Sequence, residues 1–113
     1  MHELSIATSL VETAVRNAES NGAQRVVSLD VRLGSLSGVE PEALSFCFPI
    51  VARETLCEGA ELRLRIVPAS GTCGKCGTRT DVSDLLAPCP NCGEWPLRVE
   101  GGREMRLESL EVT

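Results

Sequence analysis

Apolar side chains recur every three or four positions along the first part of the chain. The members of this stripe are Leu4, Ala7, Val11, Ala14 and Ala18. This spacing places them on one face of an amphipathic helix. The pattern therefore predicts a helix over about residues 4–20, ended by Asn21–Gly22, where glycine takes up the left-handed conformation that stops helices.

Three later segments alternate between apolar and polar residues, which predicts half-buried strands. They are residues 27–33, 60–66 and 103–113. In the third, the alternation slips by one position between Leu107 and Leu110. Because such a slip turns the apolar side chains to the other face, we expect a β-bulge near Ser109 to absorb it.

A second helical pattern begins at Pro41, between the first two predicted strands. Leu44 and Phe48 lie four positions apart on its apolar face, with Cys47 between them. Pro49 interrupts this pattern, because proline lacks an N–H and its ring clashes with the carbonyl four residues back. We expect a kink or a restart of the helix at Pro49.

Residues 72–99 differ in composition from both of their flanks. They are rich in cysteine, glycine, proline and polar residues, and they contain few side chains suited to a core. This predicts a small inserted domain at about 70–100. The main domain is then discontinuous and comprises residues 1–69 plus 101–113.

The insert carries two C-x-x-C pairs, each followed by glycine. The four cysteines are Cys73, Cys76, Cys89 and Cys92. Two such turns facing each other place four sulfurs around one tetrahedral ion, and Zn(II) is its natural occupant, ahead of rubredoxin-type iron. Four thiolates leave no open coordination position, so we expect a structural site that stabilises a segment too small to fold unaided.

The only histidine of the chain is His2. The α-amine of Met1 with the amide and imidazole nitrogens of His2 would form two fused chelate rings, and Glu3 adds an amide nitrogen or a carboxylate. A planar set of nitrogens suits Ni(II) or Cu(II). Taken by itself, the position of His2 is better explained as that of an ordinary residue at a frayed terminus, and only the rest of the chain favours a ligand.

The bulk properties exclude several classes of function. The chain has 113 residues, 42% of them apolar and 3% aromatic, with a net charge of −5. The acidic balance argues against nucleic-acid binding. We find no signal peptide and no candidate membrane span, which predicts a cytoplasmic protein whose cysteines are ligands or reduced thiols.

A catalytic triad and a glycine-rich phosphate loop are also missing, so we expect no enzyme. We expect Cys47 to be a buried, inert thiol. We expect the thiol of Cys57 to be partly exposed.

Several stretches together resemble the HypA/HybF family of hydrogenase-maturation proteins. The stretches are 1–6, 34–42, 44–48, 55–62 and 102–105, together with the two cysteine pairs. The resemblance covers essentially the whole chain. It is most specific where the opening Met1-His2-Glu3 is combined with the four cysteines, and Pro49 is the one position that departs from the family pattern.

The resemblance implies an α+β fold, in which two helices lie on a three-stranded antiparallel sheet that carries a small zinc-ribbon-like domain. It implies a nickel metallochaperone with Ni(II) at Met1, His2 and Glu3 and Zn(II) at the four cysteines. The implied partners are a HypB-type GTPase and the large subunit of [NiFe]-hydrogenase, and in some organisms related proteins also supply urease. The rival interpretations are a zinc-ribbon module that binds protein or nucleic acid, and a rubredoxin-like electron carrier.

Overall fold

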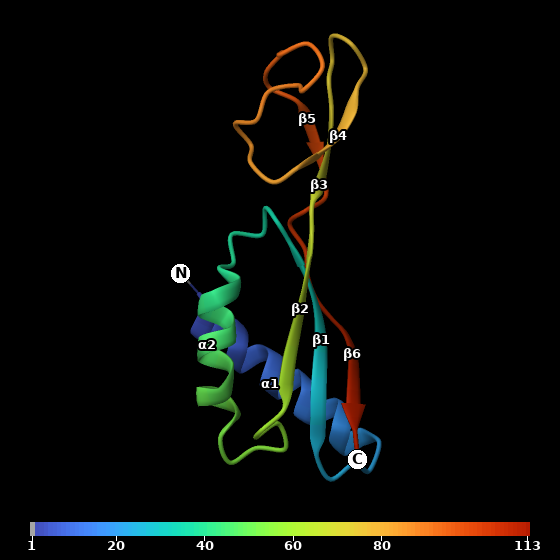
Figure 1. The fold of residues 1–113 in the computed structure, drawn as a ribbon. Helices are drawn as coiled ribbons and strands as arrows, with labels where there is room; N and C mark the ends of the chain where they lie inside the picture. Colours follow the sequence, from blue (N-terminus) through green and yellow to red (C-terminus); the bar gives the residue numbers. More distant parts are fainter. Residues whose placement is uncertain (1) are drawn as a thin grey trace. The chain divides into compact units, whose positions relative to one another are not determined.

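The computed structural model describes residues 2–113, and Figure 1 traces them in chain order. The elements are α1 (Glu3–Ser20), β1 (Val26–Gly34), α2 (Pro41–Ala52), β2 (Glu61–Val67), β3 (Ala69–Thr72), β4 (Arg79–Val82), β5 (Arg98–Glu100) and β6 (Met105–Val112). They form two three-stranded sheets, ordered β2-β1-β6 and β4-β3-β5. Within residues 2–113, no helix combines the length and the apolar character needed to cross a membrane.

The strands β1 and β6 of the larger sheet run antiparallel. At one end the N–H of Thr113 donates to the carbonyl of Arg25 at 3.0 Å. At the other end the N–H of Gly34 donates to the carbonyl of Glu104 at 2.7 Å. As the residue numbers rise along β1, the numbers of the facing residues in β6 fall, as in an antiparallel pair.

The strands β1 and β2 run in the same direction. The N–H of Val26 donates to the carbonyl of Leu56 at 2.8 Å, and the N–H of Ser35 donates to that of Val67, also at 2.8 Å. The intervening α2 makes the crossover that parallel neighbours need. The predicted α+β class, with two helices and a three-stranded sheet, is confirmed. Within that sheet, the expected antiparallel arrangement holds for β6 and not for β2.

Both helices bury their apolar faces. The two helices pack against each other, and Figure 1 shows them beside the sheet. The buried apolar side chains of α1 are Ala7, Leu10, Val11, Ala14 and Ala18, and those of α2 are Leu44, Phe48 and Ala52. The predicted restart at Pro49 is wrong, because α2 continues through it to Ala52. Pro49 and Ser45 lie on the exposed side of α2, so water can solvate the Ser45 carbonyl that loses its partner.

A polar network covers the other face of the larger sheet. Asp30 Oδ1 accepts from Arg63 Nε at 2.8 Å, and Asp30 Oδ2 accepts from Ser109 Oγ at 2.9 Å. The Arg63 guanidinium, followed by the Ser109 hydroxyl, lowers the pKa of Asp30. Glu108 binds Arg65 at 3.0 Å on the same face. Because the adjacent residues 108 and 109 both reach this face, strict alternation breaks where the sequence predicted a bulge.

The chain divides into two compact units. We call the first the helical unit (Met1–Arg32, Val39–Arg65 and Arg106–Thr113) and the second the cysteine unit (Leu33–Gly38 and Ile66–Met105). The cysteine unit has its own small core, formed by Ala69, Cys73, Val82, Cys89 and Leu97. Two of these five side chains are cysteines, so the core depends on the state of the sulfurs.

The antiparallel sheet β4-β3-β5 gives the cysteine unit its frame. β3 lies in the middle and pairs with β4 and β5 on its two sides. Leu36 and Val99 pack against the small core from outside. Trp95 is about half exposed, and its indole N–H donates to the carbonyl of Leu85 at 3.1 Å.

Candidate metal centres

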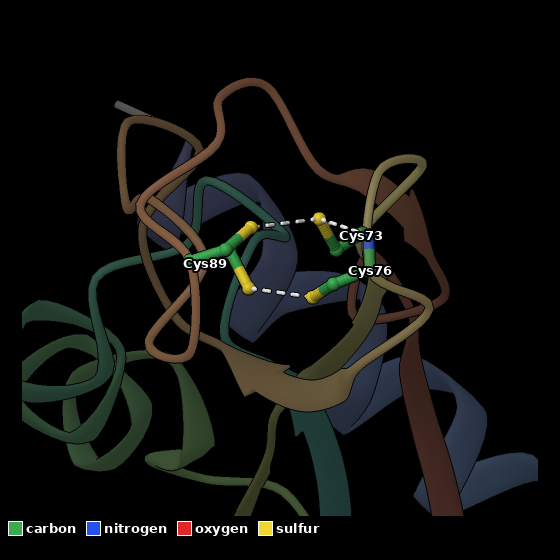
Figure 2. Close-up of side chains that lie close together, drawn as sticks. Cys73, Cys76 and Cys89 are labelled. Atoms are coloured by element: carbon green, nitrogen blue, oxygen red, sulfur yellow. Dashed lines mark hydrogen bonds between the residues drawn. The ribbon is translucent and has the colours of Figure 1, made fainter.

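The four cysteine sulfurs converge at one point of the cysteine unit. All four Sγ atoms lie within 4.8 Å of one another. The pairs Cys73–Cys92 and Cys76–Cys89 each have an Sγ–Sγ distance of 3.6 Å. A tetrahedron with Zn–S bonds of about 2.3 Å has edges of about 3.8 Å, so this spacing fits a zinc ion. Figure 2 shows Cys73 and Cys76 pointing toward Cys89 across the space between them.

Two similar turns present these sulfurs. In the first, the N–H of Gly77 donates to the carbonyl of Cys73 at 2.9 Å, and in the second, the N–H of Gly93 donates to that of Cys89 at 2.8 Å. The φ angles of Gly77 and Gly93 are +77° and +79°. A side chain would strain this left-handed conformation, which explains the glycine after each C-x-x-C pair.

Hydrogen-bond donors around the first pair favour thiolates. The N–H groups of Lys75 and Cys76 each donate to Cys73 Sγ at 3.4 Å. Cys76 Sγ lies 3.1 Å from the Thr78 hydroxyl and 3.6 Å from the Asn91 amide. Hydrogen bonding by Thr78, and then by Asn91, lowers the pKa of Cys76 to about 5.

The second pair shows the cost of crowding four thiols together. The N–H of Cys92 lowers the pKa of Cys89. The N–H of Glu94 also lowers the pKa of Cys92. Desolvation and the other three cysteines have the larger effect, and they raise this pKa to about 12. The neighbouring sulfurs therefore oppose the ionisation of Cys92. A bound divalent cation would remove this conflict by displacing the protons.

The donor chemistry of the cluster fits a resident metal ion. Thiolates select zinc or iron, and four of them close the coordination shell. Within residues 2–113, this cluster is the one group of three or more potential ligands that is arranged to hold a metal. Cys47 is half-buried, and Cys57 is fully buried, contrary to the partial exposure expected for it. Burial raises the pKa of Cys57, so it is a poor nucleophile or ligand.

Two of the three predicted nickel ligands, His2 and Glu3, lie at the start of α1. Met1 lies outside the described residues. His2 is exposed and is the N-cap of α1, with its carbonyl accepting from the N–H of Ile6 at 2.9 Å. The first four N–H groups of a helix have no acceptor within it. The amide nitrogens of His2 and Glu3 are therefore not needed to hold α1 together.

The side chain of Glu3 connects the two helices of the helical unit. Its Oε2 accepts from the N–H of Glu40, the N-cap of α2, at 3.0 Å. Glu3 is only 6% exposed. The Glu40 N–H is the main cause that lowers the pKa of Glu3 to about 2. Of the two donors expected from Glu3, this arrangement favours the amide nitrogen, because the carboxylate already has a structural partner.

Three residues that sequence reasoning did not single out complete these surroundings. They are Thr78 and Asn91 near the sulfurs, and Glu40 beside Glu3. Thr78 and Asn91 lie within two residues of a cysteine, so their position next to the C-x-x-C pairs could have identified them as neighbours of the sulfurs. Glu40 is 37 residues from Glu3, and nothing in the local pattern connects them.

Comparison with known proteins assigns the chain to a family. A model described as "Hydrogenase/urease nickel incorporation, metallochaperone, hypA" matches residues 1–112. The chain is 44% identical to the hydrogenase maturation factor HypA of Geobacter metallireducens and 46% identical to that of Synechococcus elongatus, and each match covers 99% of both chains. The solution structure of the Ni metallochaperone HypA from Helicobacter pylori has a TM-score of 0.68 at 27% identity, covering 99% of this chain and 97% of the other.

Proposed function

The chain belongs to the HypA family of nickel-incorporation metallochaperones, and from this premise we propose that it binds Ni(II) at Met1, His2 and Glu3. The ligands in this proposal are the terminal amine, the amide and imidazole nitrogens of His2, and the amide nitrogen of Glu3. The carrier then delivers the ion for maturation of [NiFe]-hydrogenase. It forms and breaks coordination bonds only, so it is not an enzyme.

The exposure of His2 at the start of α1 is the observation that carries this proposal. The imidazole is open to solvent, and the first N–H groups of a helix have no acceptor within the helix itself. A planar set of nitrogens suits the tetragonal preference of Ni(II). One side of a terminal site also stays open, which allows a recipient to take over the ligands one at a time.

We assign the second metal, zinc, to Cys73, Cys76, Cys89 and Cys92. In this assignment residues 1–69 plus 101–113 form the nickel-binding domain, and residues 70–100 form the zinc-binding domain. The two ions are kept apart by ligand type, since thiolates hold zinc and nitrogens hold nickel. The closed thiolate shell keeps its ion while the open nitrogen site releases its own.

The proposed partners follow from the family role. They are a HypB-type GTPase and the large subunit of [NiFe]-hydrogenase, and we place the protein in the cytoplasm. A role in supplying urease follows from the family description and depends on whether the host makes that enzyme.

Substitution of His2 tests the proposal. We expect His2→Ala in the untagged protein to weaken Ni(II) binding by at least about tenfold, because the variant loses one nitrogen and the six-membered chelate ring. Zinc should stay near one ion per chain. Isothermal titration calorimetry with Ni(II) and metal analysis of the same samples measure the two quantities.

Two controls make the result specific. Ser5→Ala changes an exposed residue in the same turn of α1 and should leave the nickel affinity unchanged. One extra residue before Met1 should weaken binding, because it moves the amine out of the chelate ring. Equal nickel affinity in the parent and in His2→Ala would refute the site. Purified protein that contains iron instead of zinc would favour the electron-carrier alternative.

A further inference from the structure

A groove runs along the helical unit, between the C-terminal half of α1 and the segment that follows α2. Its volume is about 710 Å³, which is in the range of binding sites for side chains and small ligands. Val11, Val15 and Leu56 supply its apolar lining. None of these residues belongs to either candidate metal centre.

Hydrogen bonds hold the wall of the groove in place. The Thr55 hydroxyl donates to the carbonyl of Ala52 at 2.7 Å and accepts from the N–H of Cys57 at 3.0 Å. The carbonyl of Leu56 accepts from the N–H of Val26 at 2.8 Å, which fixes this residue to β1. The wall is therefore formed before any ligand arrives, which lowers the entropy cost of binding.

The rim of the groove is acidic. Glu12, Glu19 and Glu54 contribute three carboxylates, and Arg16 contributes one guanidinium, so the rim carries a net charge of −2. Glu54 has a φ of +62°, a conformation that non-glycine residues adopt rarely, and it lies on the rim. This charge disfavours nucleic acid, and it disfavours a second copy that would present the same rim.

We propose that this groove docks a basic amphipathic segment of a partner protein. Apolar side chains of that segment cover Val15 and Leu56, and its lysines or arginines meet the carboxylates on the rim. Val11, the groove residue nearest to the start of α1, is 8 residues beyond Glu3, or about 12 Å along the helix axis. A partner held in the groove therefore leaves the start of α1 accessible. This inference is independent of the proposed nickel site.

A pair of designed peptides tests the groove. One is a helical peptide with a leucine face and a lysine face, and the other has glutamate in place of lysine. Each is titrated into the ¹⁵N-labelled, zinc-loaded full chain without nickel. We expect the lysine peptide to shift the amide resonances of residues 11–19 and 54–56, and the glutamate peptide to leave them in place.

Variants distinguish docking in the groove from general attraction to an acidic protein. We expect the double variant Glu12→Lys/Glu19→Lys to weaken lysine-peptide binding by at least about tenfold, because two attractions become repulsions. Asp81→Lys/Glu100→Lys changes the net charge equally at exposed positions outside the groove and should keep the affinity within about threefold. Val15→Ser should also weaken binding, since it removes apolar contact, and its amide spectrum shows whether it folds.

Three outcomes would overturn the proposal. Equal loss of affinity in the two charge-reversal variants would mean that only net charge matters. Resonance shifts centred on other residues would place the peptide elsewhere. If sedimentation shows a dimer that Val15→Ser abolishes, the groove binds a second copy of the chain instead of a partner protein. Each of these results leaves the nickel proposal unaffected.

Discussion

At the scale of single residues, Glu3 combines two roles that use different atoms. Its carboxylate accepts the N–H at the start of α2, and its own amide nitrogen is one of the proposed metal donors. The carboxylate holds the first turn of α1 beside α2, and so it positions the backbone that would chelate the ion. A residue that the sequence marks as a metal ligand is thus also a structural link between two helices.

Glu3→Gln separates these roles. We expect a lower melting temperature, because a neutral amide is a weaker acceptor than a carboxylate for the N–H of Glu40. Nickel affinity should stay within about threefold of the parent, since the backbone donors are unchanged. Calorimetric titration and thermal unfolding of the same samples check both quantities. A loss of nickel binding as large as that of His2→Ala would instead make the carboxylate a direct ligand.

At the scale of secondary-structure elements, side-chain networks connect the three strands of the larger sheet. Arg63 of β2 and Ser109 of β6 both bind Asp30 of the central strand β1. Each neighbouring strand therefore contributes a hydrogen bond to one carboxylate. This network is exposed, so its contribution to stability is modest and depends on salt and pH.

Asp30→Asn tests the network through its pH dependence. The pKa of Asp30 is lowered in the folded state, so its stabilising effect is present above the unfolded pKa of about 3.9 and is lost as the pH falls through the folded value. We expect the variant to melt below the parent at pH 7 and the difference to shrink below about pH 4. Asp81→Asn, an exposed aspartate on β4, is the matched control. A difference that stays constant down to pH 2 would contradict this explanation.

The elements of the helical unit were predictable because their patterns are local. The stripe that includes Ala7 and Val11 gave α1, and the alternation around Leu29 and Val31 gave β1. The direction of β2 was not predictable from its own residues, since alternation is the same in parallel and antiparallel strands. The strands β3, β4 and β5 were missed because they have three or four residues each, too few to show a period.

At the scale of the whole molecule, the two units obtain their stability from different sources. The helical unit buries the apolar faces of two helices and a central strand. The cysteine unit has a core of five side chains, two of which are cysteines of the candidate metal site. So small a core does not supply the free energy of an ordinary domain, and a metal-thiolate site commonly makes up the difference.

Removal of zinc should therefore unfold the cysteine unit and leave the helical unit folded. With a strong chelator at neutral pH, we expect amide dispersion to collapse for residues 66–105 while α1 and α2 keep their helical circular dichroism. Restoring Zn(II) should restore the spectrum. If the whole chain unfolds together, the helical unit depends on zinc as well, and the two sources of stability are not separate.

The candidate sites and the groove differ in how well they could be predicted from the sequence. The cysteine cluster was predictable because each C-x-x-C pair sets its own turn, and two turns suffice for a tetrahedral shell. The surroundings of Glu3 were not, because they depend on Glu40 from the start of another helix. The groove was also hidden, since the segment of Leu56 reaches α1 only in the folded chain.

The position of Trp95 has a practical consequence for optical experiments. It is the only tryptophan, the chain has no tyrosine, and both phenylalanines belong to α2. Intrinsic fluorescence excited at the red edge of protein absorption therefore comes from the cysteine unit alone. A melting curve recorded by this emission would describe that unit and remain blind to the part of the chain that carries His2.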